Sequence, residues 1–159
     1  MNKILMAITL GAVFITPSAE AGLYVGIMGG SATTDVQHSS SKVFAGIQII
    51  PNLGIEGAYT DFGGYRGASA NSVSVSVVGT LPLGDTWDLF GLWGATQNRT
   101  NNAGTNSRND MLTGFGIAYN ASKNLGIRLQ AENYGKLPTD TDGTSTTVSN
   151  WGVGVKFMF

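Results

Sequence analysis

The segment S-N-W-G-V-G-V-K-F-M-F, residues 149–159, decides the fold class of this chain. From Trp151 onward its odd-numbered residues are large and apolar, whereas its even-numbered residues are mostly small or polar, and this period of two is typical of a β-strand. The segment stops on an aromatic ring, whereas the ends of soluble domains usually fray into water. We therefore expect a strand that lies in lipid. Its apolar face consists of Trp151, Val153, Val155, Phe157 and Phe159.

The first 21 residues have the pattern of a Sec signal peptide. Lys3 supplies a positive charge, residues 4–15 are mostly apolar, and residues 19–21 read A-E-A, which matches an A-x-A cleavage site. An apolar run of about 12 residues is too short for a transmembrane helix, which needs roughly 20. We expect export through Sec, a signal peptide over residues 1–21, and a single domain over residues 22–159.

Composition excludes several classes of partner. Charged residues are 12% of the chain, against roughly 25% in ordinary soluble domains, and glycine contributes 23 of 159 residues. The formal net charge of −1 gives no electrostatic basis for binding nucleic acid. There is no cysteine, so disulfides do not hold the fold, and no sequence motif indicates a metal ion or a cofactor.

Seven further segments repeat the alternation of the last one, and none shows the 3.6-residue period of a helix. At roughly 9 to 11 residues, each of the eight is long enough to cross a bilayer as a tilted strand. The eight predicted strands are residues 22–31, 42–50, 53–61, 72–81, 87–97, 110–119, 125–134 and 149–159.

The connections between these segments alternate in length. Residues 32–41, 62–71, 98–109 and 135–146 are long and polar, whereas residues 51–52, 82–86 and 120–124 are short turns. Such alternation places every long loop at one end of an antiparallel barrel and every tight turn at the other. We therefore predict an all-β fold, an eight-stranded antiparallel up-and-down transmembrane β-barrel, with four external loops and with both termini at the periplasmic end.

The second face of the predicted strands is rich in glycine, alanine and serine, which suits the filled lumen of a narrow barrel. Charges within the strands are confined to this face. If it lines the lumen, they should form a compensated network, because a buried charge costs several kcal/mol unless it is paired. The alternative is a soluble sheet that carries solvated surface charges. The expected lumenal polar network consists of Glu56, Arg128, Glu132, Lys156, Gln48 and Gln130.

Four stretches resemble a known family, the small eight-stranded outer-membrane β-barrels related to the OmpA transmembrane domain. They are P-N-L-G-I-E-G-A-Y-T-D-F-G at 51–63, V-V-G-T-L-P-L-G-D at 77–85, G-I-A-Y-N-A-S-K-N-L-G-I-R-L-Q-A-E at 116–132, and V-G-V-K-F-M-F at 153–159. The resemblance implies a location in the outer membrane of a Gram-negative bacterium and a lumenal position for Glu56, Arg128, Glu132 and Lys156. It also implies that the last strand is the signal read by the barrel-assembly machinery.

A pore is disfavoured, because a narrow eight-stranded barrel leaves no open channel. The leading hypothesis for function is a monomeric, non-enzymatic integral outer-membrane protein. Its external loops would act in adhesion, surface recognition or envelope integrity. The expected partners are outer-membrane lipids and lipopolysaccharide, the assembly machinery during biogenesis, and a ligand on a host or other surface. No cofactor and no nucleic acid are expected.

His38 supports an alternative hypothesis from another class, a lipid A modifying enzyme. It is the single histidine of the chain and lies in the expected loop 32–41, close to Asp35 and to the serines at 39–41. Such a group could in principle support acyl transfer or deacylation. Spacing along the chain does not by itself establish a nucleophile and its base, so this remains the alternative.

Overall fold

The computed structural model describes residues 22–34, 37–65, 68–101, 105–138 and 146–159. The expected signal peptide, residues 1–21, and Asp35 lie outside them. The described residues form eight β-strands: β1 (Leu23–Thr33), β2 (Gln37–Ile50), β3 (Leu53–Tyr65), β4 (Ala68–Leu83), β5 (Trp87–Asn101), β6 (Thr105–Asn120), β7 (Leu125–Leu137) and β8 (Thr146–Met158).

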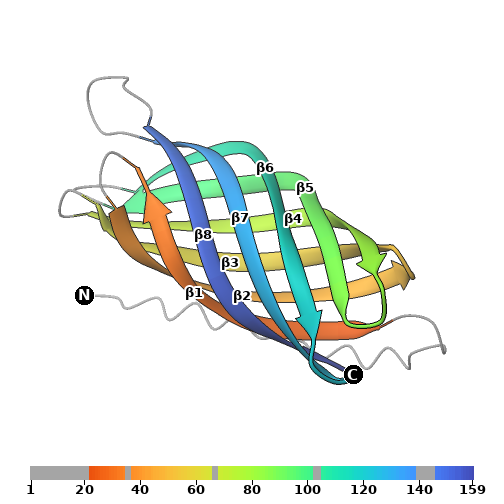
Figure 1. Cartoon of the computed structure of the whole chain (residues 1–159). Coiled ribbons are helices and arrows are strands. Elements are labelled where there is room, and N and C mark those ends of the chain that lie inside the picture. Colours follow the sequence, from red (N-terminus) through yellow and green to blue (C-terminus); the bar gives the residue numbers. More distant parts are fainter. Residues whose placement is uncertain (1–21, 35–36, 66–67, 102–104, 139–145) are drawn as a thin grey trace.

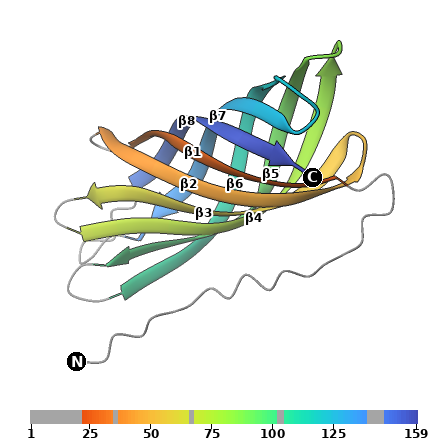
Figure 2. The ribbon, with the colours of Figure 1, turned by 90° about the horizontal axis from the view of Figure 1, so that it is seen from below.

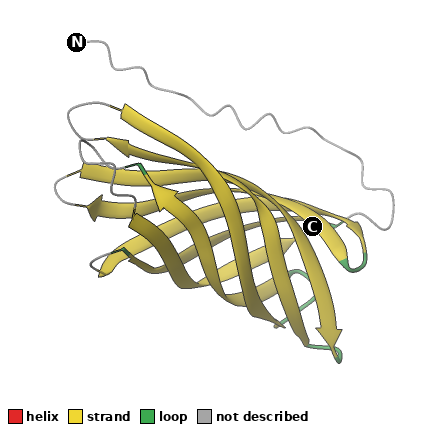
Figure 3. Cartoon of the chain, turned by 90° about the horizontal axis from the view of Figure 1, so that it is seen from above, coloured by secondary structure: helices red, strands yellow, loops and turns green. Residues whose placement is uncertain are grey.

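The strands form a closed antiparallel barrel in sequence order, as Figures 1 and 2 show from two sides, so the predicted fold class is confirmed. The seam that closes it joins β1 to β8, with register from Tyr24 opposite Met158 to Thr33 opposite Ser149. Seen in Figure 3, strands and short turns make up the whole described chain, and no helix in that part is long and apolar enough to cross a membrane. The segment that decided the fold class is therefore also the strand that closes the sheet.

The outer wall of the barrel carries the large apolar side chains. Phe115 is 68% exposed, Ile27 66% and Trp93 62%, values that would be unfavourable in water over so large a surface. Aromatic rings gather at the end with the tight turns, where Trp87 and Tyr119 lie 4.9 Å apart between ring centroids. We call this surface the apolar belt. It includes Leu23, Val25, Ile27, Val43, Ile55, Tyr59, Val73, Val75, Val77, Leu81, Leu89, Trp93, Met111, Phe115, Ile127, Leu129, Trp151, Val153, Val155 and Phe157.

The strands continue well beyond the apolar belt at the end opposite the tight turns, so the prediction of long loops was wrong for most of residues 32–41, 62–71 and 98–109. In the fourth predicted loop, residues 135–146, the strands β7 and β8 include residues 135–137 and 146. Pairing persists through Thr33 and Gln37, through Ser69 and Asn101, and through Asn101 and Thr105. Outside the membrane a strand needs no apolar face, so the period-two signal disappears although the backbone ladder continues. We call these strand ends the outer extension. It comprises residues 31–33, 37–41, 61–65, 68–71, 97–101, 105–110, 133–137 and 146–149.

The outer extension is split between β6 and β7. β6 pairs with β5 along its whole length, but with β7 only from Thr113 to Asn120. At the split the Asp110 carboxylate accepts hydrogen bonds from the backbone N–H groups of Lys136 and Met111, both at 2.9 Å. These two bonds stabilise the charged form, and they lower the pKa of Asp110. Over residues 105–112, β6 therefore forms no backbone ladder with β7.

A β-bulge in β7 produces the split. Its register with β8 shifts between Asn133 and Lys136, Gly135 has a φ of +69°, and Asn133 Oδ1 accepts a hydrogen bond from the Gly135 N–H at 2.8 Å. β3 has the same device, in which Asp61 Oδ1 accepts from the N–H of Gly63 at 2.7 Å and Gly63 has a φ of +73°. Each bulge turns one strand away from its neighbour.

Gly135→Ala is expected to lower the free energy of unfolding by about 1–3 kcal/mol. The positive φ is strained for an L-residue, and the new Cβ would overlap the Asp110 carboxylate. Urea unfolding in lipid vesicles, followed by tryptophan fluorescence, measures the loss. Gly29→Ala is the matched control, because a Cβ there meets nothing within 4 Å. Equal effects of the two substitutions would contradict the bulge as the cause.

Candidate functional site

Four charged side chains meet in the middle of the lumen, from β2, β3 and β7, and we call them the charged cluster. Arg128 Nη1 donates to Glu56 Oε2 at 2.6 Å, and Lys42 Nζ donates to Glu132 Oε1 at 2.6 Å. Lys42 Nζ also lies 3.6 Å from Glu56 Oε1, which joins the two pairs. Each of these residues is at most 3% exposed. The two positive and two negative charges compensate one another, as buried charges require.

Neutral groups extend the charged cluster in both directions along the barrel. Tyr24 Oη donates to Glu56 Oε2 at 3.1 Å, and Tyr134 Oη donates to Glu132 Oε2 at 2.9 Å. Tyr134 Oη also lies 2.9 Å from Thr60 Oγ1. The bond from Tyr134 satisfies the Glu132 oxygen that Lys42 leaves open, and the bond from Tyr24 adds a second donor to the Glu56 oxygen that Arg128 already contacts. The network therefore holds its members in one arrangement.

The Arg128 guanidinium lies between two aromatic rings. Its Cζ is 4.6 Å from the centroid of Phe44 and 4.3 Å from that of Phe90. Both contacts are within the range of a cation–π interaction, which is strongest where water is excluded. Arg128 is therefore fixed by stacking as well as by its ion pair with Glu56.

An apolar cluster fills the lumen within the outer extension, and we call it the outer plug. Its centre is the pair Phe62 and Tyr134, whose rings meet edge to face with centroids 5.0 Å apart. Phe62 lies between Asp61 and Gly63 in the bulge of β3, and Tyr134 lies between Asn133 and Gly135 in the bulge of β7. The outer plug consists of Ala32, Phe62, Ala70, Leu112, Tyr134, Leu137 and Val148. Tyr134 joins the outer plug to the charged cluster through its hydrogen bond to Glu132.

The residues predicted for the lumenal polar network do not all meet. Glu56, Arg128 and Glu132 belong to the charged cluster. Lys156 lies closer to the tight turns, with Nζ 5.6 Å from the ring centroid of Tyr24. Gln130 is buried, but its amide has no hydrogen-bond partner among the described residues. Gln48 donates to the carbonyl of Pro51 at the turn end of the barrel, away from the charged cluster.

Two members of the site were missed by sequence reasoning. Lys42 was placed at the boundary of an expected loop, although it lies two residues before the inward-facing Phe44 and therefore on the same face of β2. Tyr134 was placed at the end of an expected strand. A usable signal was present, because D-F-G at 61–63 and N-Y-G at 133–135 share one pattern of Asx, aromatic residue and glycine.

The residues proposed as the assembly signal face outward. Trp151, Val153, Val155 and Phe157 alternate along β8 with small or polar inward residues, and Phe159 follows the end of the strand. The rings of Phe157 and Phe159 meet edge to face at 5.1 Å between centroids. Their recognition by an assembly machinery stays a prediction.

His38 lies on a strand rather than in a loop, contrary to the prediction, because the β1–β2 ladder continues past Ala32, which pairs with His38. Alternation along β2 places Ser39 and Ser41 on the opposite face of the strand from His38. Ser40 shares the face of His38, but its Oγ donates to Asn150 Oδ1 at 2.5 Å. The strand therefore separates most of the residues that the enzyme hypothesis grouped together.

Comparisons with known proteins agree with the architecture. The family model described as outer membrane protein beta-barrel domain matches residues 5–159. Neisserial surface protein A (NspA) superposes with a TM-score of 0.67 at 15% identity, over 87% of this chain and 97% of that one.

Two further solved structures have the same fold. Ail, the attachment invasion locus protein of Yersinia pestis, gives a TM-score of 0.57 at 17% identity, over 87% of this chain and 97% of its own. The outer membrane enzyme PagL gives 0.55 at 13% identity, over 84% of this chain and 97% of its own. No curated protein matches the chain. The fold is thus shared by an attachment protein and by an enzyme.

Proposed function

Because the chain belongs to the outer membrane protein beta-barrel domain family, we propose that it is a non-enzymatic surface protein whose outer extension makes contacts in adhesion or envelope integrity. It is an outer-membrane barrel of eight strands, and this fold hosts both non-enzymatic members and an enzyme. Export through Sec by residues 1–21 is part of the proposal.

The observation that carries the proposal is the outer extension itself. It is a continuation of the barrel wall, so it presents side chains and backbone on a rigid support beyond the apolar belt. At its split, β6 over Ser107, Arg108 and Asn109 is exposed and forms no backbone ladder with β7. A strand edge of this kind pairs with an extended segment of another protein, whose backbone supplies the matching hydrogen bonds. Arg108 Nε lies 3.7 Å from Asp110 Oδ2, and charges of this kind protect an edge against indiscriminate pairing.

Shortening the β5–β6 hairpin tests the proposal. Replacing residues 99–107 with Asn-Gly joins the paired residues Asn98 and Arg108 through a two-residue turn and leaves the apolar belt intact. We expect Gram-negative cells that display the native barrel to attach to cultured epithelial cells several-fold better than cells with the shortened one. Heat-modifiable migration on SDS gels shows that both barrels are folded.

A double substitution is the matched control. Arg99→Gln with Ser107→Ala changes side chains on the outer face of the hairpin and preserves its backbone, so attachment should be retained. Equal attachment of native and shortened barrels, with equal sensitivity of the cells to bile salts, would overturn the proposal.

The enzyme hypothesis is tested on the same cells. Lipid A from cells with the native barrel and with His38→Ala is compared by mass spectrometry. We expect identical acyl patterns, because Ser40 bonds to Asn150 and its neighbouring serines face away from His38. An acyl chain lost or gained only with the native barrel would replace the proposal with catalysis.

A further inference from the structure

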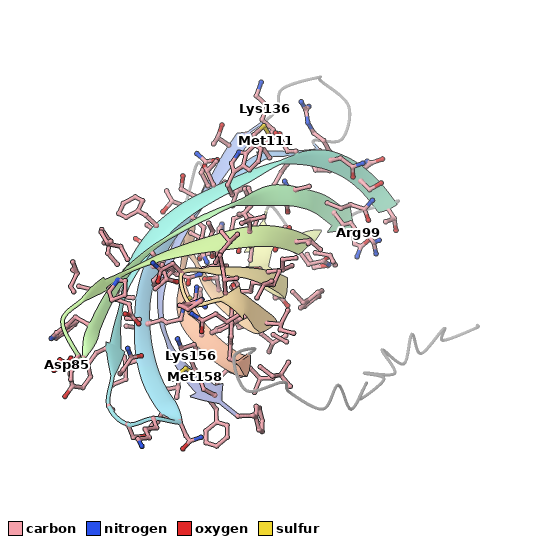
Figure 4. All side chains as sticks on the ribbon, turned by 90° about the vertical axis from the view of Figure 1, so that its right-hand side faces the viewer. Asp85, Arg99, Met111, Lys136, Lys156 and Met158 are labelled. Carbon is pink, nitrogen blue, oxygen red and sulfur yellow. The ribbon has the colours of Figure 1, made fainter. Side chains whose placement is uncertain are left out.

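The lumen contains a cavity at the end with the tight turns, on the far side of the charged cluster from the outer plug. Its volume is about 230 Å³, and the residues that line it include Tyr24, Thr80, Asp88, Asn120, Arg128 and Lys156. Figure 4 shows Lys156 and Met158, which also lines the cavity, toward the end of the barrel opposite Arg99, Met111 and Lys136. In the membrane this end faces the periplasm, because the outer extension is at the other end.

Two cations, Arg128 and Lys156, line this cavity, and the carboxylate of Asp88 lines it with them. Arg128 uses Nη1 for Glu56, and its Nε and Nη2 have no hydrogen-bond acceptor among the described residues. No described acid lies within 4 Å of Lys156 Nζ, which is oriented by the ring of Tyr24 at 5.6 Å. Arg128 is compensated by Glu56, whereas Lys156 has no ion-pair partner among the described residues. An anion that lies between the two side chains would contact both cations.

The cavity also contains hydrogen-bond acceptors, among them Asp88, Asn120 and Thr80. Asp88 Oδ2 accepts a hydrogen bond from Asn120 Nδ2 at 2.8 Å, and this carboxylate lies more than 4 Å from Lys156. Asn120 Oδ1 has no hydrogen-bond partner among the described residues, so neither it nor Asp88 satisfies the open N–H groups of Arg128. A ligand that supplies acceptor oxygens beside Arg128 and Lys156 would satisfy these donors.

The backbone leaves room for Lys156 to reach into the cavity. A Cβ on Gly126 would lie 3.5 Å from Lys156 Cε and 3.3 Å from Asn120 Oδ1. The lysine stem thus passes over a glycine, which places its ammonium group in the cavity beside Asn120 rather than in the membrane-facing wall.

We propose that this cavity binds a small oxyanion from the periplasmic side, a carboxylate or a phosphate group, with Lys156 as its direct contact and Arg128 as the cation at the closed end. Asp88 lies in the same cavity and repels a negative ligand, so it sets an upper limit on affinity. The site is independent of the outer extension, and neither proposal requires the other.

The test is a titration of the folded, full-length barrel in detergent micelles, followed by the amide resonances of Gly126 and Gly154. Sodium phosphate and sodium acetate are added in separate series, with sodium chloride at matched ionic strength as the control. We expect saturable shifts with at least one oxyanion and none with chloride. Saturation by acetate identifies a carboxylate ligand, and saturation by phosphate identifies a phosphate ligand.

Variants that are expected to change the affinity for the oxyanion in opposite directions locate the site. Lys156→Met retains the apolar stem and should weaken binding about tenfold or more, as expected for a lost hydrogen bond to a charged group. Asp88→Asn can still accept from Asn120 and should tighten binding. Lys136→Met, at the other end of the barrel, should leave it unchanged. Non-saturating shifts, equal shifts with chloride, or native affinity in Lys156→Met would each overturn the proposal.

Discussion

Glu56→Gln is expected to lower the free energy of unfolding of the barrel by about 3–5 kcal/mol, the cost of leaving a buried charge without its partner. Glu56 accepts hydrogen bonds from Arg128 at 2.6 Å and from Tyr24 at 3.1 Å, and it lies 3.6 Å from Lys42. Glutamine keeps the shape of the side chain but removes its charge, so two lumenal cations then share the single carboxylate of Glu132. Urea unfolding in lipid vesicles, with tryptophan fluorescence as the signal, gives the free energy.

Two comparisons separate charge compensation from a general loss of packing. Glu56→Gln combined with Arg128→Met removes one charge of each sign, so it should be less destabilising than the sum of the two single substitutions. Asp85→Asn removes a carboxylate from an exposed turn and should change the free energy by less than about 0.5 kcal/mol. Additive effects of the Glu56 and Arg128 substitutions would show that their ion pair does not couple them.

Val75→Arg should cost about 2–4 kcal/mol, the penalty for an arginine on the lipid face near the middle of the bilayer. Val75 is 60% exposed and lies in the apolar belt, between Gly57 on β3 and Ala95 on β5. The arginine stem has no nearby polar surface to reach, so its charge must be accommodated within hydrocarbon. The folded fraction after refolding into vesicles, read from heat-modifiable migration on gels, should fall accordingly.

Ser69→Arg is the control for this substitution, because Ser69 lies on the same strand with the same outward parity but in the outer extension. An arginine there faces water and should leave the folded fraction unchanged. If both variants refold equally well, the exposed apolar surface of the barrel does not lie in lipid. If both fail, the arginine disturbs β4 irrespective of depth.

The fold could be predicted because one physical rule applies to all eight strands. A wall with lipid on one side and a narrow filled lumen on the other requires large and small residues to alternate, and Val73 to Val77 on β4 show this with serines between them. The same rule has no force outside the bilayer. For that reason residues 98–109 looked like a loop, although most of them continue β5 and β6.

The site was only partly predictable. The alternation of residues along a strand predicts which side chains face the lumen, but it does not predict their position along the barrel axis. Glu56, Arg128 and Glu132 fall at compatible heights, whereas Lys156 and Gln48 share their face and lie nearer the turns. Lys42 had the correct parity and was assigned to a strand boundary. The partners of each charge depend on the stagger of the strands, which no local pattern in the sequence reports.

The seam between β1 and β8 has a consequence for the order of folding. Tyr24 pairs with Met158, so the contacts that close the barrel join the two most distant strands of the chain. Closing so long a loop carries the largest entropic cost of any strand pairing in this barrel. This pairing forms when only the edges of β1 and β8 remain unpaired. Until then both edges are open to association with other chains. We therefore expect the rate of barrel formation to be governed by this last pairing.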